Sequence, residues 1–322
     1  MPSPTSATTL QRPDLGQVAY EYQESAPFRG LIAQKILPLV SVRDISADYP
    51  VLPTEATMKL PNARRAQKGA YTRLGWEFAT GTYSCEEFGL ETPVDDVEAK
   101  LYMSYFDAEA ESLKITMDTM LRNQEARAAA LLFNTSNAVA NAAVSTEWST
   151  ASTCTPKADI KAAITAMRAA SGVSPNAIVM SLKVFENVLN AAELKTYLQY
   201  TAPHLVDGME AQRLTLARYF GVEEVLVGGA ISDSSKKGQS TVISDIWDDE
   251  YISLCRIAKA GEGFKTPSFG RSFLWTPDSA ANLVVETYRE EQIRANIIRV
   301  RHHIDEAIVS VGSNYLLTNI TA

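Results

Sequence analysis

The sequence has few residues of the kinds that bind metals or form disulfide bonds. It contains three cysteines and three histidines in 322 residues. Cys85, Cys154 and Cys255 lie far apart and no pair has the C-x-x-C spacing, which excludes a disulfide framework and a cysteine-based zinc site. His302 and His303 are neighbours, so on a strand they would point to opposite faces. We therefore predict no metal site and three reduced thiols.

The chain also lacks the short motifs of common enzymes. Glycines occur in "VGGA" at 227–230 and in "AGEGFK" at 260–265, but neither stretch has the spacing of a dinucleotide-binding loop or a Walker loop. There is no G-x-S-x-G elbow, and three histidines leave few bases for a nucleophilic triad. We predict no catalytic residue and no cofactor. One alternative stays open, in which the acidic residues between 86 and 98 hold a metal in a soluble α/β enzyme.

Long apolar runs are absent as well. No stretch is long enough to span a membrane, and the polar N-terminus lacks the apolar core of a signal peptide. Both features predict synthesis in the cytoplasm and no membrane partner. The formal net charge of -8 argues against a protein that grips nucleic acid through a broad basic surface. A mildly acidic wall would still suit a container that must not adhere to enclosed DNA.

The residues that are present predict a change of structure along the first half of the chain. Residues 1–27 are polar and contain four prolines, which predicts an extended arm. Residues 46–93 alternate like strands between prolines and glycines, and we expect one strand through Leu74, Trp76 and Phe78. From 106 to 133, apolar residues recur at three-to-four spacing without glycine or proline, which predicts one long helix.

The second half predicts alternating helices and strands. Helices are expected in "PKADIKAAITAMRAASG", ended by Gly172, and in "DGMEAQRLTLARYFG", ended by Gly221. Buried strands are expected in "NAIVMS" and "EVLVGGA". The tail is rich in strand-forming residues, with turns expected near Asp305 and Gly312. The whole chain is therefore predicted to be an α+β protein.

Charge is separated along the ribbon that precedes the long helix. Five basic residues and no acid occur between 58 and 75, and a strongly acidic stretch follows. Opposite charges segregated along one projecting element suit contact with an identical neighbour, so we infer that the ribbon finds its core on another subunit. The residues assigned to inter-subunit contact are the basic Lys59, Arg64, Arg65, Lys68 and Arg73, the acidic Glu86, Glu87, Glu91, Asp95 and Asp96, and the aromatic Trp76, Phe78, Tyr83 and Phe88.

The ordered series of segments resembles the major capsid proteins of tailed bacteriophages with the Hong Kong 97 fold. The segments that carry the resemblance are "TYSCEEFGLETPVDD", "AEAESLKITMDTMLRNQEARAAALLF", "NAIVMS", "IWDDEYISL" and "TPSFGRSFLW", in this order. The resemblance implies an N-terminal arm at 1–45 and an extended β-hairpin E-loop at 46–98. It further implies a peripheral domain with the long spine helix and a β-sheet at 99–150, completed by 285–322, and an α/β axial domain at 151–284.

The resemblance implies a non-enzymatic shell protein. We expect a major capsid protein that self-assembles into pentamers and hexamers of an icosahedral head around double-stranded DNA, which it encloses without sequence-specific binding. The expected location is the virion, after assembly in the host cytoplasm. Expected partners besides itself are a portal, a scaffolding protein and a decoration protein. Because the arm starts close to Met1, the resemblance implies a scaffold on a separate chain, or none. An encapsulin-like nanocompartment shell on the same fold is the alternative.

Overall fold

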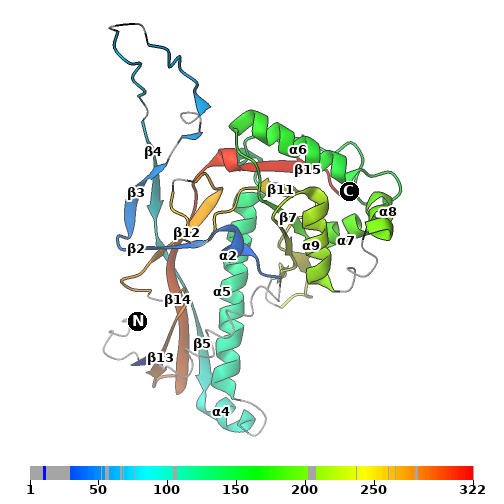
Figure 1. Cartoon of the computed structure of the whole chain (residues 1–322). Helices are drawn as coiled ribbons and strands as arrows, with labels where there is room; N and C mark the ends of the chain where they lie inside the picture. The colour runs from blue at the N-terminus through cyan, green and yellow to red at the C-terminus, as the bar shows by residue number, and fades with distance from the viewer. Residues whose placement is uncertain are drawn as a thin grey trace.

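The computed structural model shows an elongated protein with a projecting finger at one end, a long sheet and helix along its length, and an α/β unit on one side (Figure 1). The finger consists of residues 46–84. The structure describes residues 10–11, 30–51, 53–54, 58–65, 67, 69–75, 77–103, 107–201, 208–236, 238–259, 261–264, 266–279 and 282–321.

A six-stranded sheet forms the long axis of the molecule. Its central strand β14 (Ala295–Ile308) pairs with β5 (Glu86–Asp95) through ten consecutive positions, from Glu86 opposite Ile304 to Asp95 opposite Ala295. The turn expected near Asp305 is wrong, because β14 continues through it; the turn lies at 291–294. The remaining strands are β1 (Leu10–Gln11), β13 (Val284–Glu290), β12 (Gly270–Trp275) and β2 (Leu39–Val42), in the order β1-β13-β14-β12-β2.

The long helix predicted from the spacing is α5 (Ala108–Leu132). It begins at Asp107, whose carboxylate accepts hydrogen bonds from the amides of the first turn. Leu113, Met117 and Leu121 lie on the buried face, and this face packs on strand residues of β13 and β14 to form one core. The shorter helix α4 (Asp96–Tyr102) connects β5 to the start of α5.

The α/β unit is built on a five-stranded sheet of order β6-β15-β11-β7-β8. Helices α6 and α9 end at Gly172 and Gly221, as predicted, because both glycines take left-handed φ values of 70° and 75°. Strand β7 is buried at every residue, also as predicted. The elements are β6 (Asn141–Ala143), α6 (Pro156–Ser171), β7 (Ala177–Ser181), α7 (Leu182–Asn190), α8 (Ala192–Thr201), α9 (Met209–Phe220), β8 (Glu224–Gly228), β11 (Ile252–Cys255) and β15 (Asn314–Thr318).

Small elements connect these units. Helix α2 (Ala33–Ile36) precedes β2, and a separate hairpin is formed by β9 (Ile231–Asp233) and β10 (Ile243–Asp245). Two short 3-10 turns lie at Thr135–Asn137 and Val311–Ser313, the second at the turn expected near Gly312. The sheets divide the tail, because β14 belongs to the long sheet and β15 to the α/β unit. The four domain boundaries expected from the sequence stay a prediction.

The finger is a hairpin only at its base. β3 (Ser46–Val51) pairs with β4 (Ala79–Ser84) in antiparallel register, from Ser46 opposite Ser84 to Val51 opposite Ala79. The strand expected around Leu74 and Phe78 is wrong, since the described residues between 58 and 78 form no strand. Trp76, expected on the same strand, lies outside the described residues. Cys85 separates β4 from β5, so the chain leaves the hairpin there and joins the long sheet.

One buried carboxylate joins the long helix to the segment before β2 and to the loop before β11 of the α/β unit. Glu125 of α5 is only 1% exposed and accepts hydrogen bonds from the amides of Ile32 (2.9 Å) and Ala33 (2.8 Å) at the start of α2. The indole of Trp247, next to the α/β unit, donates to the same carboxylate at 2.7 Å. Burial raises the pKa of Glu125, and the three hydrogen bonds oppose this rise.

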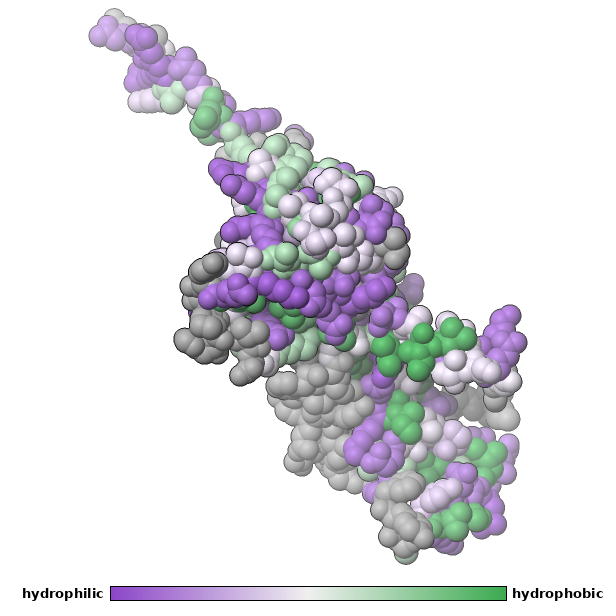
Figure 2. Space-filling view, turned by 90° about the vertical axis from the view of Figure 1, so that its right-hand side faces the viewer, coloured by the Kyte–Doolittle hydropathy of each residue, from purple (hydrophilic) through white to green (hydrophobic). Residues whose placement is uncertain are grey.

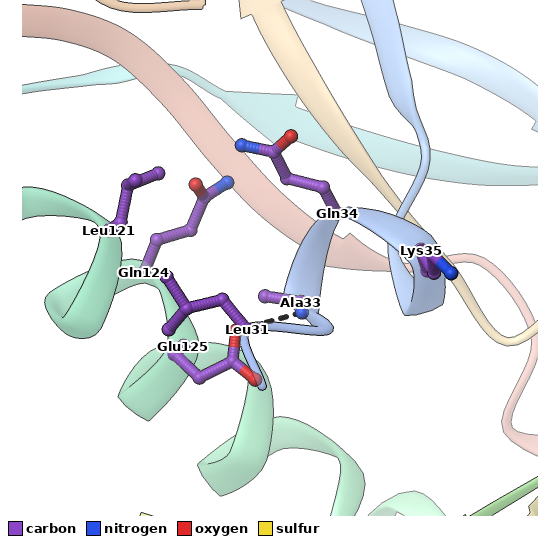
Figure 3. Close-up of a pocket in the computed structure, with 7 residues that line it drawn as sticks. All are labelled: Leu31, Ala33, Gln34, Lys35, Leu121, Gln124 and Glu125. Atoms are coloured by element: carbon purple, nitrogen blue, oxygen red, sulfur yellow. Dashed lines mark hydrogen bonds between the residues drawn. The ribbon is translucent and has the colours of Figure 1, made fainter. Parts of the chain in front are cut away.

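A cavity of about 30 Å³ lies beside Glu125, between α2 and α5 (Figure 3). This is room for a water molecule. The amides of Gln34 and Gln124 line it, and within the described part of the chain their buried Nε2 atoms have no hydrogen-bond partner. The junction is thus closely packed around the carboxylate, with one small polar gap at its edge.

Replacement of Glu125 by Ala should destabilise the protein. The change leaves two backbone N–H groups and one indole N–H buried without an acceptor, so we expect the free energy of unfolding to fall by about 3 kcal/mol. Chemical denaturation of the soluble protomer measures this loss, and hydrogen exchange should rise at residues 30–37. Asn123→Ala, on the exposed face of the same helix, is the matched control. Equal stability of Glu125→Ala and Asn123→Ala would contradict the assigned role.

Candidate inter-subunit surface

The base of the finger has a core within its own subunit. Tyr83 is 7% exposed, and its ring stacks on Phe273 of β12 with centroids 4.5 Å apart. Tyr49 packs on the same ring at 5.1 Å and covers Gly81, where no side chain would fit. Cys85 completes the cluster, and burial raises the pKa of its thiol to about 11. The inference that the whole ribbon lacks a core of its own is therefore wrong for its base.

The distal loop of the finger, residues 58–75, has no such core. Leu60 is 98% exposed, and Tyr71 and Leu74 are also largely exposed. The loop is ordered by polar contacts instead: the guanidinium of Arg65 donates to the carbonyl of Gly69 at 2.7 Å and lies 4.7 Å above the ring of Tyr71. This loop projects away from the rest of the molecule (Figure 1), so its apolar side chains face solvent in the isolated protomer.

The basic residues assigned to contact lie on this loop. Lys59, Arg64, Arg65 and Arg73 are exposed, and none of them forms an ion pair with another described residue. Lys68, assigned to the same set, lies outside the described residues. The loop is therefore a positively charged surface without neutralising carboxylates among the residues that the structure describes.

The acidic residues assigned to contact are placed differently. Glu91 pairs with Arg299 across the sheet at 2.6 Å, and Asp96 pairs with Arg289 at 2.6 Å, a contact that lowers the pKa of Asp96. Asp95 is the N-cap of α4, where its carboxylate accepts from the amide of Val97 at 2.7 Å. Most of this stretch therefore has partners inside the protomer.

Glu86 and Glu87 remain exposed, with His303 3.8 Å from Glu87. Phe78 is exposed, whereas Phe88 is half-buried beneath the guanidinium of Arg127 at 4.0 Å. Contact of any assigned residue with a neighbouring subunit stays a prediction. The protomer shows which of them have exposed surface for one: Lys59, Arg64, Arg65, Arg73, Phe78, Glu86, Glu87 and Glu91.

A charged network on the long sheet was missed by the sequence analysis. Arg301 of β14 pairs with Asp278 and, at 2.7 Å, with Glu286 of β13. Arg299 lies on the same face and is 3.5 Å from Glu286, and His303 is 2.9 Å from Asp278. The signal was present in the alternation of Arg299, Arg301 and His303 at a period of two, which places all three on one face of a strand.

The opposite face of β14 packs on α5. Arg127 of the helix forms a two-point pair with Glu306, at 2.9 and 2.8 Å, while its guanidinium covers Phe88. His302 is 1% exposed on this side and meets the ring of Phe88 edge-on at 5.9 Å. Burial, with a smaller contribution from Arg127, lowers the pKa of His302 to about 4.

The described part of the chain contains no candidate metal site and no candidate membrane-spanning helix. Among the described residues, no three His, Cys, Asp or Glu side chains group closely enough to hold a metal ion. None of the described helices is both long and apolar enough to cross a lipid bilayer. Figure 2 shows exposed hydrophobic side chains in separate patches on one face of the molecule, at some distance from the mostly hydrophilic end of the finger.

Solved structures match this fold over nearly its whole length. A phage-related protein from Bordetella bronchiseptica RB50 has a TM-score of 0.71 at 20% identity, covering 97% of this chain and 98% of that one. A virus-like particle from Pyrococcus furiosus has a TM-score of 0.56 at 11% identity, covering 95% of this chain and 98% of that one. The capsid of cyanophage P-SCSP1u has a TM-score of 0.56 at 8% identity, covering 88% of this chain and 86% of that one. No protein-family description and no curated protein matches the sequence.

The likeness to the Bordetella protein covers 97% of this chain. The chain has the α+β Hong Kong 97 phage-capsid fold. This confirms the fold class expected from the sequence.

The buried His302 should make stability depend on pH. In the unfolded chain its pKa is near the ordinary 6.5, so between about pH 6.5 and pH 4 the unfolded state binds more protons than the folded state. We therefore expect the free energy of unfolding to fall by up to about 3 kcal/mol across this window on acidification. Denaturation curves measured from pH 7 to pH 4 give the slope.

His302→Leu removes this titration and should flatten the slope. Phe88→Leu loosens the same packing without removing a titrating group, so it should lower stability by a similar amount at every pH. An unchanged slope in His302→Leu would show that another group carries the pH dependence.

Proposed function

We propose that this chain is a structural shell protein, the major capsid protein of a tailed double-stranded DNA phage. It would self-assemble into pentamers and hexamers of an icosahedral head. The fold supports this proposal, because the capsid of cyanophage P-SCSP1u shares it over 88% of this chain and a phage-related protein shares it over 97%. In this proposal the residues 151–284 meet their neighbours at the axes of the capsomers, and the finger reaches an adjacent copy.

The observation that carries the proposal is the distal loop. It presents Leu60, Tyr71 and Leu74 to solvent together with four basic residues that form no ion pair with any described residue, while its base is fixed in a core. Exposed apolar side chains and unpaired charges on a loop anchored at its base are features of a surface that binds a partner. Within a monomer, the apolar side chains of this projecting loop bury little surface and so add little to its stability.

The proposed partners follow from this role. The chain would bind itself, a portal and a scaffolding protein, with a decoration protein as a further partner, and would enclose double-stranded DNA without reading its sequence. The overall negative charge supports enclosure without adhesion, because an acidic wall repels phosphate. We propose the virion as its location, after assembly in the host cytoplasm.

Reversal of charge on the finger should prevent assembly. Arg64→Glu with Arg65→Glu changes two exposed residues that contact no core, so the protomer should stay folded and soluble. We expect the double variant to lose closed particles in negative-stain electron microscopy and to sediment as small species. Normal heads from this variant would count against the role of the finger. Arg64→Lys with Arg65→Lys keeps the positive charge at the same two positions and is the matched control.

The contents of the particles separate a phage head from the encapsulin-like alternative. We expect shells isolated from the native host to contain double-stranded DNA of one uniform, genome-like length, because a head is filled through a portal. Nuclease treatment followed by gel analysis and mass spectrometry of the contents measures this. Shells that hold one enzyme and no DNA would identify a cellular compartment instead.

A further inference from the structure

Two buried side-chain amides face the small cavity between α2 and α5. Gln34 extends from α2 and Gln124 from the second half of α5, and Figure 3 shows their side chains reaching toward each other. Gln124 is only 2% exposed. Both Nε2 atoms are buried, and neither has a hydrogen-bond partner among the described residues. The two helices that meet at Glu125 therefore bring two N–H donor groups to one small space.

Buried donors of this kind need an acceptor. An amide N–H that is removed from water without a new partner destabilises the folded state. For this reason, buried polar groups in folded proteins are nearly always paired, either with other protein groups or with ordered water. Two such amides that line the same cavity from different helices indicate an acceptor that they share inside it.

The size of the cavity limits what this acceptor can be. Its volume of about 30 Å³ has room for a water molecule and is far below the space that an organic ligand occupies. Lys35 also lines the cavity, but its amine is 3.7 Å from Glu224 and about two-fifths exposed, so its charge has a partner elsewhere. The acceptor is therefore a species of one or two heavy atoms.

The groups around the cavity select among the small species. A metal cation would face two N–H groups, which repel it. An anion would lie beside the buried carboxylate of Glu125, which lines the same cavity. A water molecule suits both, because its oxygen accepts two hydrogen bonds and its hydrogens are donated. Glu125 accepts hydrogen bonds from Ile32, Ala33 and Trp247, and its two oxygens can accept more than three.

We propose that this cavity is a binding site for one water molecule, which accepts hydrogen bonds from Nε2 of Gln34 and Nε2 of Gln124 and donates toward Glu125. The water joins α2 to α5 at a second point, beside the backbone hydrogen bonds of Ile32 and Ala33 to the carboxylate. Such a bridge contributes nearly as much as a direct hydrogen bond. The site lies within one protomer, so it does not depend on the shell role.

A crystal structure at a resolution that shows ordered water tests the site directly. We expect one density peak within hydrogen-bond distance of both Nε2 atoms. A direct hydrogen bond between Gln34 and Gln124, with one amide turned over and no peak, would overturn the proposal. Crystals soaked in bromide distinguish an anion from water, because bromide gives an anomalous signal. A bromide peak at this position would show an anion site and would also overturn it.

A double-mutant cycle tests whether the two glutamines share one partner. Gln34→Met and Gln124→Met each remove a donor at nearly constant volume. We expect each to lower the midpoint of chemical denaturation and to speed hydrogen exchange at the amides of Ile32 and Ala33 by about fivefold. In the double variant the loss should be clearly smaller than the sum of the two single losses, because the first substitution already removes the shared water.

The control for the cycle is Gln239→Met, on the exposed turn between β9 and β10, which should leave both measurements unchanged. Additive losses in the double variant would mean that the two amides have separate partners, and this would contradict a shared water. Single variants as stable as the Gln239→Met control would do so too. The crystal structure of the unaltered chain needs no substitution, so it decides the question even if a variant fails to fold.

Discussion

The rest of the structure depends on the carboxylate of Glu125. A carboxylate in a protein interior costs desolvation energy unless hydrogen bonds offset it, and here the three donors come from two other parts of the chain, residues 32–33 and Trp247. Ile32 and Ala33 fix the segment that continues into β2, α5 carries the acid itself, and Trp247 fixes the α/β unit. Because removal of any part leaves charged or polar groups unpaired, the three parts are held in one relative position. Glu125 is therefore the single point at which these three segments, distant in the sequence, are fixed relative to one another.

The two ends of the molecule also keep a fixed position relative to each other. The base of the finger is packed through Tyr83 and Tyr49 on Phe273, and at the opposite end the start of α4 is held by Asp96, Arg289 and Arg294. Between them lie β14 and α5, joined by Arg127 and Glu306. A long helix packed on a long strand is stiff, so the distance and angle between the ends are set by the fold. In a shell, this fixed angle would become the angle between neighbouring subunits.

Local patterns in the sequence predicted the local elements well. The spacing of Leu113, Met117 and Leu121 predicted α5 to within a few residues. Gly172 and Gly221 predicted the ends of two helices, because the residue that ends each helix adopts a left-handed conformation, which glycine favours. Pairing between distant segments was not predictable in the same way. The acids of β5 looked free in sequence, yet Glu91 lies opposite Arg299, more than two hundred residues away. Glu125 gave one local signal, a charge on the buried face of the helix, but its three donors become neighbours only after folding.

The distribution of charge would restrict the orientations in which two copies can approach each other. With a net charge of -8, two protomers repel one another in most orientations. We propose that attraction is confined to the orientation that brings the basic distal loop to an acidic surface of the next copy, so that repulsion elsewhere would select against side-by-side and random contacts. Each such contact is exposed and screened by salt, and is therefore weak by itself. Weak, oriented contacts let a misplaced subunit leave before the lattice closes, whereas a closed lattice holds each subunit by several of them at once. A charge pattern that opposes association in general is thus compatible with assembly of one ordered shell.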